Sequence, residues 1–373
     1  MSGFTITAGV SFSGGFTFTE APPPSENTAA WFGGGYANDP APGAMRSTVQ
    51  RITYATDTAT ASVRGPLSSV RQSLAAASNL TDGWFGGGFN PAASPSTLSL
   101  VNRITFATDT DTASVRGPLS LARYSLAAAG NSTDAWFGGG NPGPLFSTVD
   151  RITYATDTAT ATARGPLSQV IYNLAAVGNT TDGWFGAGNS GPPSYENRST
   201  VDRITYATDT ATASVRGPLS AARKFLAATG NTDYGWFGGG TPGPTSTVER
   251  ITYATDTATA SVRGPLSSAR YVLAAAGNTT DGWFGGGATP SDSSRVDRIT
   301  YATDTATASV RGPLSSARAY LAATGNTDYG WFGGGNSSST VQRITYATDT
   351  ATASVRGTLS EARSYLAAAG GMQ

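Results

Sequence analysis

A unit of about 50 residues repeats seven times along this chain of 373 residues, and this repeat constrains the fold more than any other feature. Its clearest marker is WFGG or WFGAG, which begins at Trp31, Trp84, Trp136, Trp184, Trp236, Trp283 and Trp331. RIT[YF]ATDT and RG[PT]LS also occur seven times each. A unit of this length carries too few apolar residues to bury a core of its own, so the units must stack on one another.

Each unit contains four candidate β-strands separated by turn signals. These are the aromatic WFGGG segment, the TVDRITYAT segment, the short ATASVRG segment and the small-residue segment ARYSLAAAG, which is residues 122–130 in one copy. Alanine and leucine also favour a helix in the last segment. A Gly-Pro before it and a Gly-Asn after it leave room for only about ten residues, so we predict a strand there.

Four strands in each repeated unit are the plan of a β-propeller. The units resemble kelch repeats, which have a small-residue strand, an aromatic strand ending in a glycine doublet such as Gly33-Gly34, and a strand carrying a tyrosine. They depart from kelch in placing the tryptophan directly before the glycines. The resemblance covers residues 28–373 and implies an all-β, seven-bladed kelch-like propeller with four-stranded blades.

The two ends of the repeat predict how the ring closes. The first copy lacks its small-residue strand, and the last copy stops just after supplying one. We therefore expect residues 361–369 to join the strand at residues 29–35 in the first blade, which would remove the open sheet edges.

Residues 1–27 differ from the repeats. Apolar residues alternate with Ser and Thr, which predicts two or three short strands, at Phe4, Ile6, Val10, Phe12, Phe16 and Phe18. Three prolines from Pro22 then form a stiff spacer. We divide the chain into an N-terminal β arm with a proline-rich spacer, residues 1–27, and a propeller, residues 28–373. The arm serves either as an attachment device or as a terminal strand that pads the propeller.

Antiparallel order within a blade assigns the loops to two faces of the disc. The turn after the small-residue strand and the turn after the TVDRITYAT strand share one face and carry aspartates such as Asp82 and Asp57, while the other loops share the opposite face. Arg51, Arg64 and Arg71, with their copies, lie at strand ends near this opposite face, which predicts a charge-polarised disc. The alternative is a structural role, in which each arginine binds carbonyl groups or carboxylates such as those of Asp150, Asp202, Glu249 and Asp297.

The seven tryptophans stand at one register of the repeat. We expect them to pack between neighbouring blades, because large aromatic side chains dominate buried contacts. The alternative is a ring of exposed platforms on which sugars stack.

The loops between the WFGGG strand and the TVDRITYAT strand vary most among the copies, from YANDPAPGAMRS in the first to NSSS in the seventh. Loops on a rigid scaffold are the usual place for binding residues, and drift in unconstrained loops would give the same variation. We predict that this variable-loop face binds a ligand through Tyr36, Arg46, Phe89, Phe146, Tyr195 and Arg198.

Composition argues against an enzyme. The chain has no histidine and no cysteine, so it lacks the copper ligands of kelch-like propeller oxidases and all imidazole or thiolate metal sites. Arginines and acids recur in every copy, whereas catalytic sites are asymmetric. We predict a non-enzyme without cofactor or metal. The 24 basic and 24 acidic residues balance, and no apolar run approaches the length of a membrane span, so we expect neither nucleic acid binding nor membrane insertion.

Near-identical tandem units, abundant Gly, Ser and Thr, and a short Phe/Thr arm together resemble virion proteins of tailed bacteriophages, such as tail fibres and appendages. The resemblance implies a location in the virion, with an extracellular or bacterial-surface location as the alternative. It also implies docking on other virion subunits through residues 1–27 and attachment of the propeller to a host-surface glycan or protein. A free carbohydrate-binding lectin is the alternative function.

Overall fold

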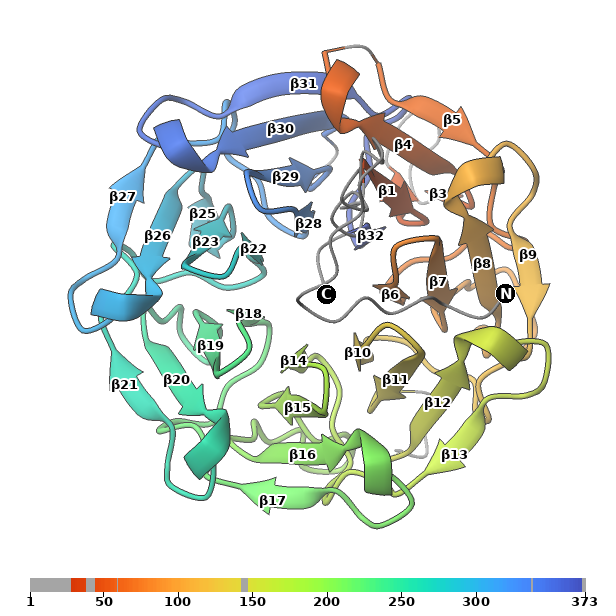
Figure 1. The fold of residues 1–373 in the computed structure, drawn as a ribbon, viewed down its shortest axis with the longest axis horizontal. Helices are drawn as coiled ribbons and strands as arrows, with labels where there is room; N and C mark the ends of the chain where they lie inside the picture. Colours follow the sequence, from red (N-terminus) through yellow and green to blue (C-terminus); the bar gives the residue numbers. More distant parts are fainter. Residues whose placement is uncertain (1–27, 38–43, 59, 142–146, 337, 371–373) are drawn as a thin grey trace, which may run out of the picture.

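Seven four-stranded antiparallel sheets lie around a common axis, so the chain folds as an all-β, seven-bladed propeller (Figure 1). The computed structural model describes residues 28–37, 44–58, 60–141, 147–336 and 338–370. The arm predicted at residues 1–27 lies outside these ranges. Among the residues described, no helix has the length and apolar character needed to cross a membrane.

Each blade runs outward from the axis through four strands in the order that the repeat encodes. The innermost strands are β6 (Ala75–Ser78), β10 (Ala127–Gly130), β14 (Ala175–Gly178), β18 (Ala227–Gly230), β22 (Ala274–Gly277), β28 (Ala322–Gly325) and β32 (Ala367–Ala369). The second strands are β1 (Ala29–Gly33), β7 (Asp82–Gly86), β11 (Asp134–Gly138), β15 (Asp182–Gly186), β19 (Tyr234–Gly238), β23 (Asp281–Gly285) and β29 (Tyr329–Gly333).

The outer half of each blade holds the other two strands. The third strands are β4 (Val49–Thr53), β8 (Val101–Thr105), β12 (Val149–Thr153), β16 (Val201–Thr205), β20 (Val248–Thr252), β26 (Val296–Thr300) and β30 (Thr340–Thr345). The outermost strands are β5 (Ser62–Arg64), β9 (Ser114–Arg116), β13 (Thr162–Arg164), β17 (Ser214–Arg216), β21 (Ser261–Arg263), β27 (Ser309–Arg311) and β31 (Ser354–Thr358). Two small hairpins, β2 (Tyr36–Ala37) with β3 (Ala44–Met45) and β24 (Ala288–Thr289) with β25 (Ser291–Asp292), decorate the variable loops.

The ring closes as predicted. Strand β32 at the C-terminal end pairs antiparallel with β1, with Trp31 opposite Ala369 and Gly33 opposite Ala367. The first blade therefore takes its innermost strand from the far end of the chain. Small residues suit all seven innermost strands because these strands crowd together at the axis; a Cβ atom added to Gly230 would lie 2.8 Å from Val177 of the preceding blade.

The aromatic residue that follows each third strand departs from the sequence prediction. It was expected within that strand but begins a short 3-10 turn, at Tyr54–Thr56, Phe106–Thr108, Tyr154–Thr156, Tyr206–Thr208, Tyr253–Thr255, Tyr301–Thr303 and Tyr346–Thr348. In each turn the aromatic side chain is buried. It packs against the neighbouring blade, which places the turn within the joint between blades.

Each joint between blades is made by the same set of side chains, shown here for blades four and five. The ring of Trp184 stacks on Tyr253 of the next blade with 3.7 Å between ring centroids. Its indole N–H donates to a carboxylate oxygen of Asp256 at 2.8 Å. Arg203 and Arg216 form ion pairs with the same carboxylate at 3.2 and 3.4 Å. Trp184 is 1% exposed and Asp256 is 4% exposed.

The tryptophan–aspartate hydrogen bond recurs in all seven joints. The pairs are Trp31–Asp109, Trp84–Asp157, Trp136–Asp209, Trp184–Asp256, Trp236–Asp304, Trp283–Asp349 and Trp331–Asp57. All seven tryptophans are at most 2% exposed. Packing between blades is therefore confirmed, and the alternative of exposed sugar platforms is wrong.

The predicted separation of arginines from aspartates onto opposite faces is also wrong. Arg51 and Arg64 both form ion pairs with Asp109 of the next blade. The physical reason is blade twist. Figure 1 shows the outermost strand β5 running along the circumference toward the second blade, which brings Arg64 to that blade's 3-10 turn. These arginines are structural, as the alternative proposed.

A second set of arginines is buried at the start of the innermost strands. Arg123 is 0% exposed, forms an ion pair with Asp150 at 2.7 Å, and donates to the carbonyl oxygens of Phe137 and Thr148. Six of the seven blades, including that of Arg123, have a buried arginine at this position. Blade four departs from this pattern, because Ile171 replaces the arginine and Asp202, also 0% exposed, forms no ion pair among the described residues.

Candidate functional site

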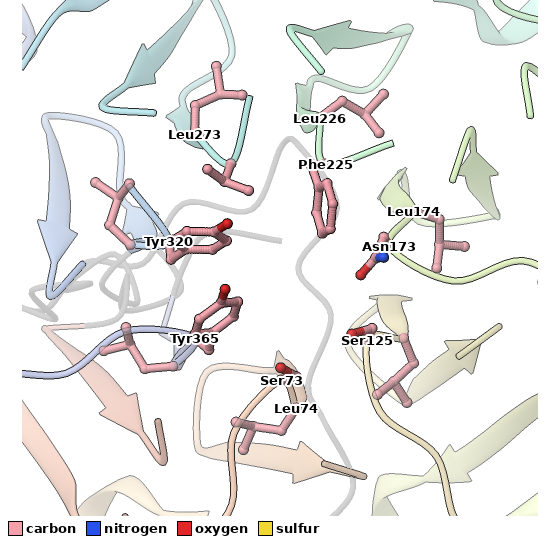
Figure 2. A pocket seen from close by; sticks show the side chains of 14 residues that line it. Ser73, Leu74, Ser125, Asn173, Leu174, Phe225, Leu226, Leu273, Tyr320 and Tyr365 are labelled. Atoms are coloured by element: carbon pink, nitrogen blue, oxygen red, sulfur yellow. The ribbon is translucent and has the colours of Figure 1, made fainter. Parts of the chain in front are cut away.

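The strongest candidate site is a ring of side chains around the axis, one from each blade, which we call the collar. Each collar residue lies two positions after the buried arginine (Ile171 in blade four) and directly before a leucine that all seven copies share. The collar consists of Ser73, Ser125, Asn173, Phe225, Val272, Tyr320 and Tyr365. Figure 2 shows an opening at one end of the axis with the side chains that line it. The pairing of Gln72 with Phe89 and of Ser364 with Tyr36 places the variable loops at the same end.

Backbone hydrogen bonds link the collar into a closed circle. The N–H of each collar residue donates to the carbonyl oxygen of the collar residue in the preceding blade, at 2.8 to 3.2 Å. The circle closes where Tyr365 donates to Tyr320 and Ser73 donates to Tyr365. Each collar residue therefore uses its main-chain donor and acceptor on its two neighbours, and only its side chain varies.

This circle holds every collar residue in a left-handed backbone conformation, with φ between 49° and 58°. Such a conformation costs an L-residue about 1–2 kcal/mol and costs glycine nothing comparable. Even Val272, a β-branched residue that rarely adopts positive φ, stands in the collar, and no copy uses glycine there. The circle of hydrogen bonds explains the backbone. It does not explain why seven side chains are kept against the strain, and strain of this kind gathers at functional sites.

The collar has two chemically different arcs. Ser73, Ser125 and Asn173 offer hydroxyl and amide groups, while the next four residues are aromatic or apolar. Figure 2 shows Tyr320 and Tyr365 on one side of the opening, and Ser125 and Asn173 on the other. The opening is therefore chemically asymmetric, although the seven blades that surround it are nearly identical.

The two tyrosines of the collar form a packed pair with 4.2 Å between ring centroids. Burial, together with a hydrogen bond to Tyr320, raises the pKa of Tyr365, so its hydroxyl stays protonated at neutral pH. Tyr365 is nevertheless 37% exposed. The collar and its leucines line a cavity of about 210 Å³, which is smaller than the roughly 300–1,000 Å³ that drug-sized ligands fill. The cavity suits the end group of a larger ligand.

The opposite end of the axis provides a useful contrast. A cavity of about 380 Å³ lies there, lined by Ala, Gly, Ser, Thr and Asn residues that hardly differ among blades. The amides of Asn131, Asn179 and Asn231 each donate to a threonine carbonyl of the next blade, so this rim is structural. The larger cavity therefore has the less distinctive chemistry, and we place the candidate site at the collar.

Two of the residues predicted from the sequence lie beside the collar. Tyr36 pairs with Ser364, the residue before Tyr365, and Phe89 pairs with Gln72, the residue before Ser73. The Phe89 ring also lies 5.2 Å from the ring of Tyr124. The variable-loop face and the collar are thus one continuous surface.

Tyr195 also belongs to this surface. It is 55% exposed with φ of 48°. Burial raises the pKa of Tyr124, and Tyr172 and Tyr195 contribute to this rise. Phe146, the fourth predicted aromatic residue, lies outside the described residues.

The two predicted arginines are engaged in local ion pairs. Arg46 binds Glu361 at 2.5 Å, and Thr48 donates to the same carboxylate at 2.8 Å. Arg198 binds Glu196 at 2.9 Å. Arg46 therefore helps to tie the first variable loop to the neighbouring loop, whereas Arg198 and Glu196 stay within one exposed loop.

Sequence reasoning missed the collar, although the signal was present. Between the arginine position and the shared leucine, two adjacent residues read QS, YS, YN, KF, YV, AY and SY in successive blades. Their flanks are almost constant. Aligning the seven copies with one another isolates these two columns, which are far shorter than the variable loops.

Comparison with known structures supports the fold. The solved structure of YjhT superposes on this chain with a TM-score of 0.60 at 13% sequence identity, covering 78% of this chain and 98% of YjhT. No protein-family model matches the sequence, and no curated protein matches it either. At this level of identity the likeness to YjhT shows a shared fold.

Proposed function

We propose that this propeller is a non-enzymatic binding protein that takes the end of a carbohydrate chain at the collar. The observation that carries the proposal is the asymmetry of the collar. Seven blades that share almost every buried side chain differ at the one ring of positions that faces the axis at the variable-loop end. Variation at a fixed and strained backbone position points to selection for recognition.

The chemistry of the two arcs suits a saccharide. A sugar ring offers apolar C–H faces and a rim of hydroxyl groups. Tyr320, Tyr365 and Phe225 provide aromatic surface, and Ser125 and Asn173 provide donors and acceptors across the opening. Ligand sites generally combine mostly apolar walls with a few placed polar groups in this way.

The same residues favour binding over catalysis. The seven collar residues include no carboxylate, imidazole or thiol. The pKa of Tyr365 is raised above its ordinary value, so this hydroxyl is a hydrogen-bond donor at neutral pH and a poor general base. No group of three acidic, His or Cys side chains that would hold a metal ion occurs in the described residues.

The biological setting that we propose is attachment of a tailed-phage virion to a host-surface glycan, with residues 1–27 docking the propeller on another virion subunit. This part rests on the kelch-like repeat, the composition and the sequence of the arm. Sedimentation of the protein with purified virions tests it. A protein that stays in the supernatant would favour the free-lectin alternative.

Substitutions borrowed from sibling blades test the site. Blades two and three carry serine where Tyr320 and Tyr365 stand, so Tyr320→Ser with Tyr365→Ser keeps the collar backbone. We expect the wild-type protein to bind members of an oligosaccharide panel, measured by array and titration calorimetry. The double variant should lose about tenfold or more in affinity, a loss of roughly 1.4 kcal/mol.

Val355→Ala is the matched control, because Val355 is exposed on the outermost strand and blade three carries Ala163 at that position. It should bind as the wild type does. Equal affinity of the double variant and the wild type would overturn the collar assignment. Conversion of a bound saccharide, followed by nuclear magnetic resonance, would overturn the non-enzymatic assignment.

A further inference from the structure

Lys224 stands apart from the other cations of this chain. It is the only lysine, the other 23 of the 24 basic residues being arginine. It directly precedes the collar residue Phe225, and its ammonium nitrogen lies 5.5 Å from the centroid of the Phe225 ring. Its backbone pairs with Thr241 of the adjacent variable loop. The lysine therefore lies on the inner rim of the candidate site.

The arginines that recur from blade to blade have structural roles, and Lys224 has none of these roles. The arginines equivalent to Arg51 and Arg64 bind the joint aspartates, and those equivalent to Arg71 are buried at the start of the inner strands. In the other copies the position of Lys224 holds Gln, Tyr, Ala or Ser, so the fold requires no charge there.

The surroundings of Lys224 contain little negative charge. Neither the collar residues nor the seven residues that precede them include a carboxylate. On the variable loops of the two neighbouring blades, Glu196 is bound by Arg198, and Asp292 accepts a hydrogen bond from Asn336. Within the described part of the chain, no carboxylate lies within ion-pair distance of the Lys224 ammonium group. The opening of the collar therefore carries a cation, the Lys224 ammonium group, for which the described residues supply no counter-ion.

We infer that the ligand of the collar is an anionic saccharide, and that Lys224 binds its carboxylate or sulfate group. This inference rests on the proposed function. A lysine suits the role because its ammonium group is a compact charge on a flexible stem, which can follow an acidic group at the edge of a sugar ring. The sugar ring itself would rest on the neighbouring aromatic arc, with Phe225 next to the charged contact.

Two aromatic neighbours strengthen this placement. Tyr172 and Tyr271 occupy the same position as Lys224 in the blades on either side. Their hydroxyl groups provide further donors near an anion. Charge-assisted hydrogen bonds are roughly twice as strong as neutral ones, so the acidic group would decide which saccharide is selected.

The experiment uses matched pairs of oligosaccharides, each an acidic member with its carboxyl-reduced or desulfated counterpart, bound to the full-length protein. We expect the acidic members to bind about tenfold or more tightly, and their affinity to fall as salt is raised. Lys224→Met, which keeps an unbranched stem, should remove both the preference and the salt dependence, and Lys224→Arg should retain part of each. Uronic and sulfated pairs, tested separately, distinguish a carboxylate from a sulfate.

Arg295→Met is the control, because Arg295 is an exposed cation on a variable loop outside the collar. It should leave the preference for acidic saccharides intact. Equal affinity for both members of every pair, or an unchanged preference in Lys224→Met, would overturn the inference while leaving the proposed function in place. If no saccharide binds at all, the proposed function fails and the inference fails with it.

Discussion

The joints between blades and the collar are both rings of seven positions, but they differ in how much their side chains change from blade to blade. At the joints the side chains hardly change from blade to blade, are almost fully buried, and donate to or accept from one another. At the collar the backbone repeats while the side chains change, are partly exposed at most positions, and are held at positive φ. Identity among copies therefore marks what the fold needs, and variation at a fixed geometry marks what it leaves free for recognition.

The joints should dominate stability. Trp184→Ala removes a stacked, buried indole and deprives Asp256 of one of its donors. We expect the free energy of unfolding to fall by about 3–5 kcal/mol, as for other buried large-to-small changes. Chemical denaturation measures this loss.

Val215→Ala is the control for that substitution, because Val215 lies on the outermost strand of the same blade and is 59% exposed. Its effect should stay within about 0.5 kcal/mol. A loss below roughly 1 kcal/mol in Trp184→Ala would show that the joints do not hold the ring and would break the comparison.

The sequence was sufficient for features that rest on repetition. The seven blades, the closure through β32 and the burial of the tryptophans all follow from patterns printed seven times. The positions of Arg51 and Arg64 could not be read in the same way, because blade twist carries Arg64, at the end of the outermost strand β5, to the next blade, and Arg51 reaches the same blade from the middle of β4. That displacement is a property of the assembled sheet.

The collar could not be predicted from the sequence for a different reason. Its positive φ comes from hydrogen bonds between residues of neighbouring blades, about 50 positions apart for Ser73 and Ser125. Local patterns around Ser125 read as an ordinary strand and do not show the strain. The sequence shows only that the side chain at this position changes among the copies, and the variable loops, which carry Tyr36 and Tyr195, vary more strongly.

Asp202 tests the same comparison at a buried position. It lies in blade four, the blade that lacks the buried arginine found in the other six. Burial raises the pKa of Asp202, and hydrogen bonds from Ser168 oppose that rise. Ile171 stands where six other blades place an arginine. A carboxyl group whose pKa is higher in the folded state binds its proton more tightly when folded. Its contribution to stability is therefore complete below the unfolded pKa of about 4 and is lost as pH rises through the folded pKa.

Asp202→Asn removes this dependence and copies Asn102, whose amide already donates to Ala113 and Ser68 in blade two. The variant should match the wild type at about pH 3 and become progressively more stable than it toward about pH 8. Denaturation at a series of pH values measures the difference. Ile171→Arg, which supplies the missing guanidinium, should shrink the wild-type pH dependence; a constant difference between Asp202→Asn and the wild type at all pH values would contradict the assignment.

The smallest expected effect tests the collar itself. Ser125→Gly puts glycine, which adopts φ of 55° without strain, at one position in the polar arc of the collar. The main-chain hydrogen bonds of the collar stay unchanged. Relief of left-handed strain outweighs the added freedom of glycine in the unfolded chain, so we expect a gain of about 0.5–1 kcal/mol in the free energy of unfolding, together with weaker saccharide binding. Ser214→Gly in the outermost strand β17, which lacks positive φ, is the control and should lose about 0.5–1 kcal/mol. If both variants lose stability equally, the collar stores no strain, and the reason for assigning its side chains to a ligand disappears.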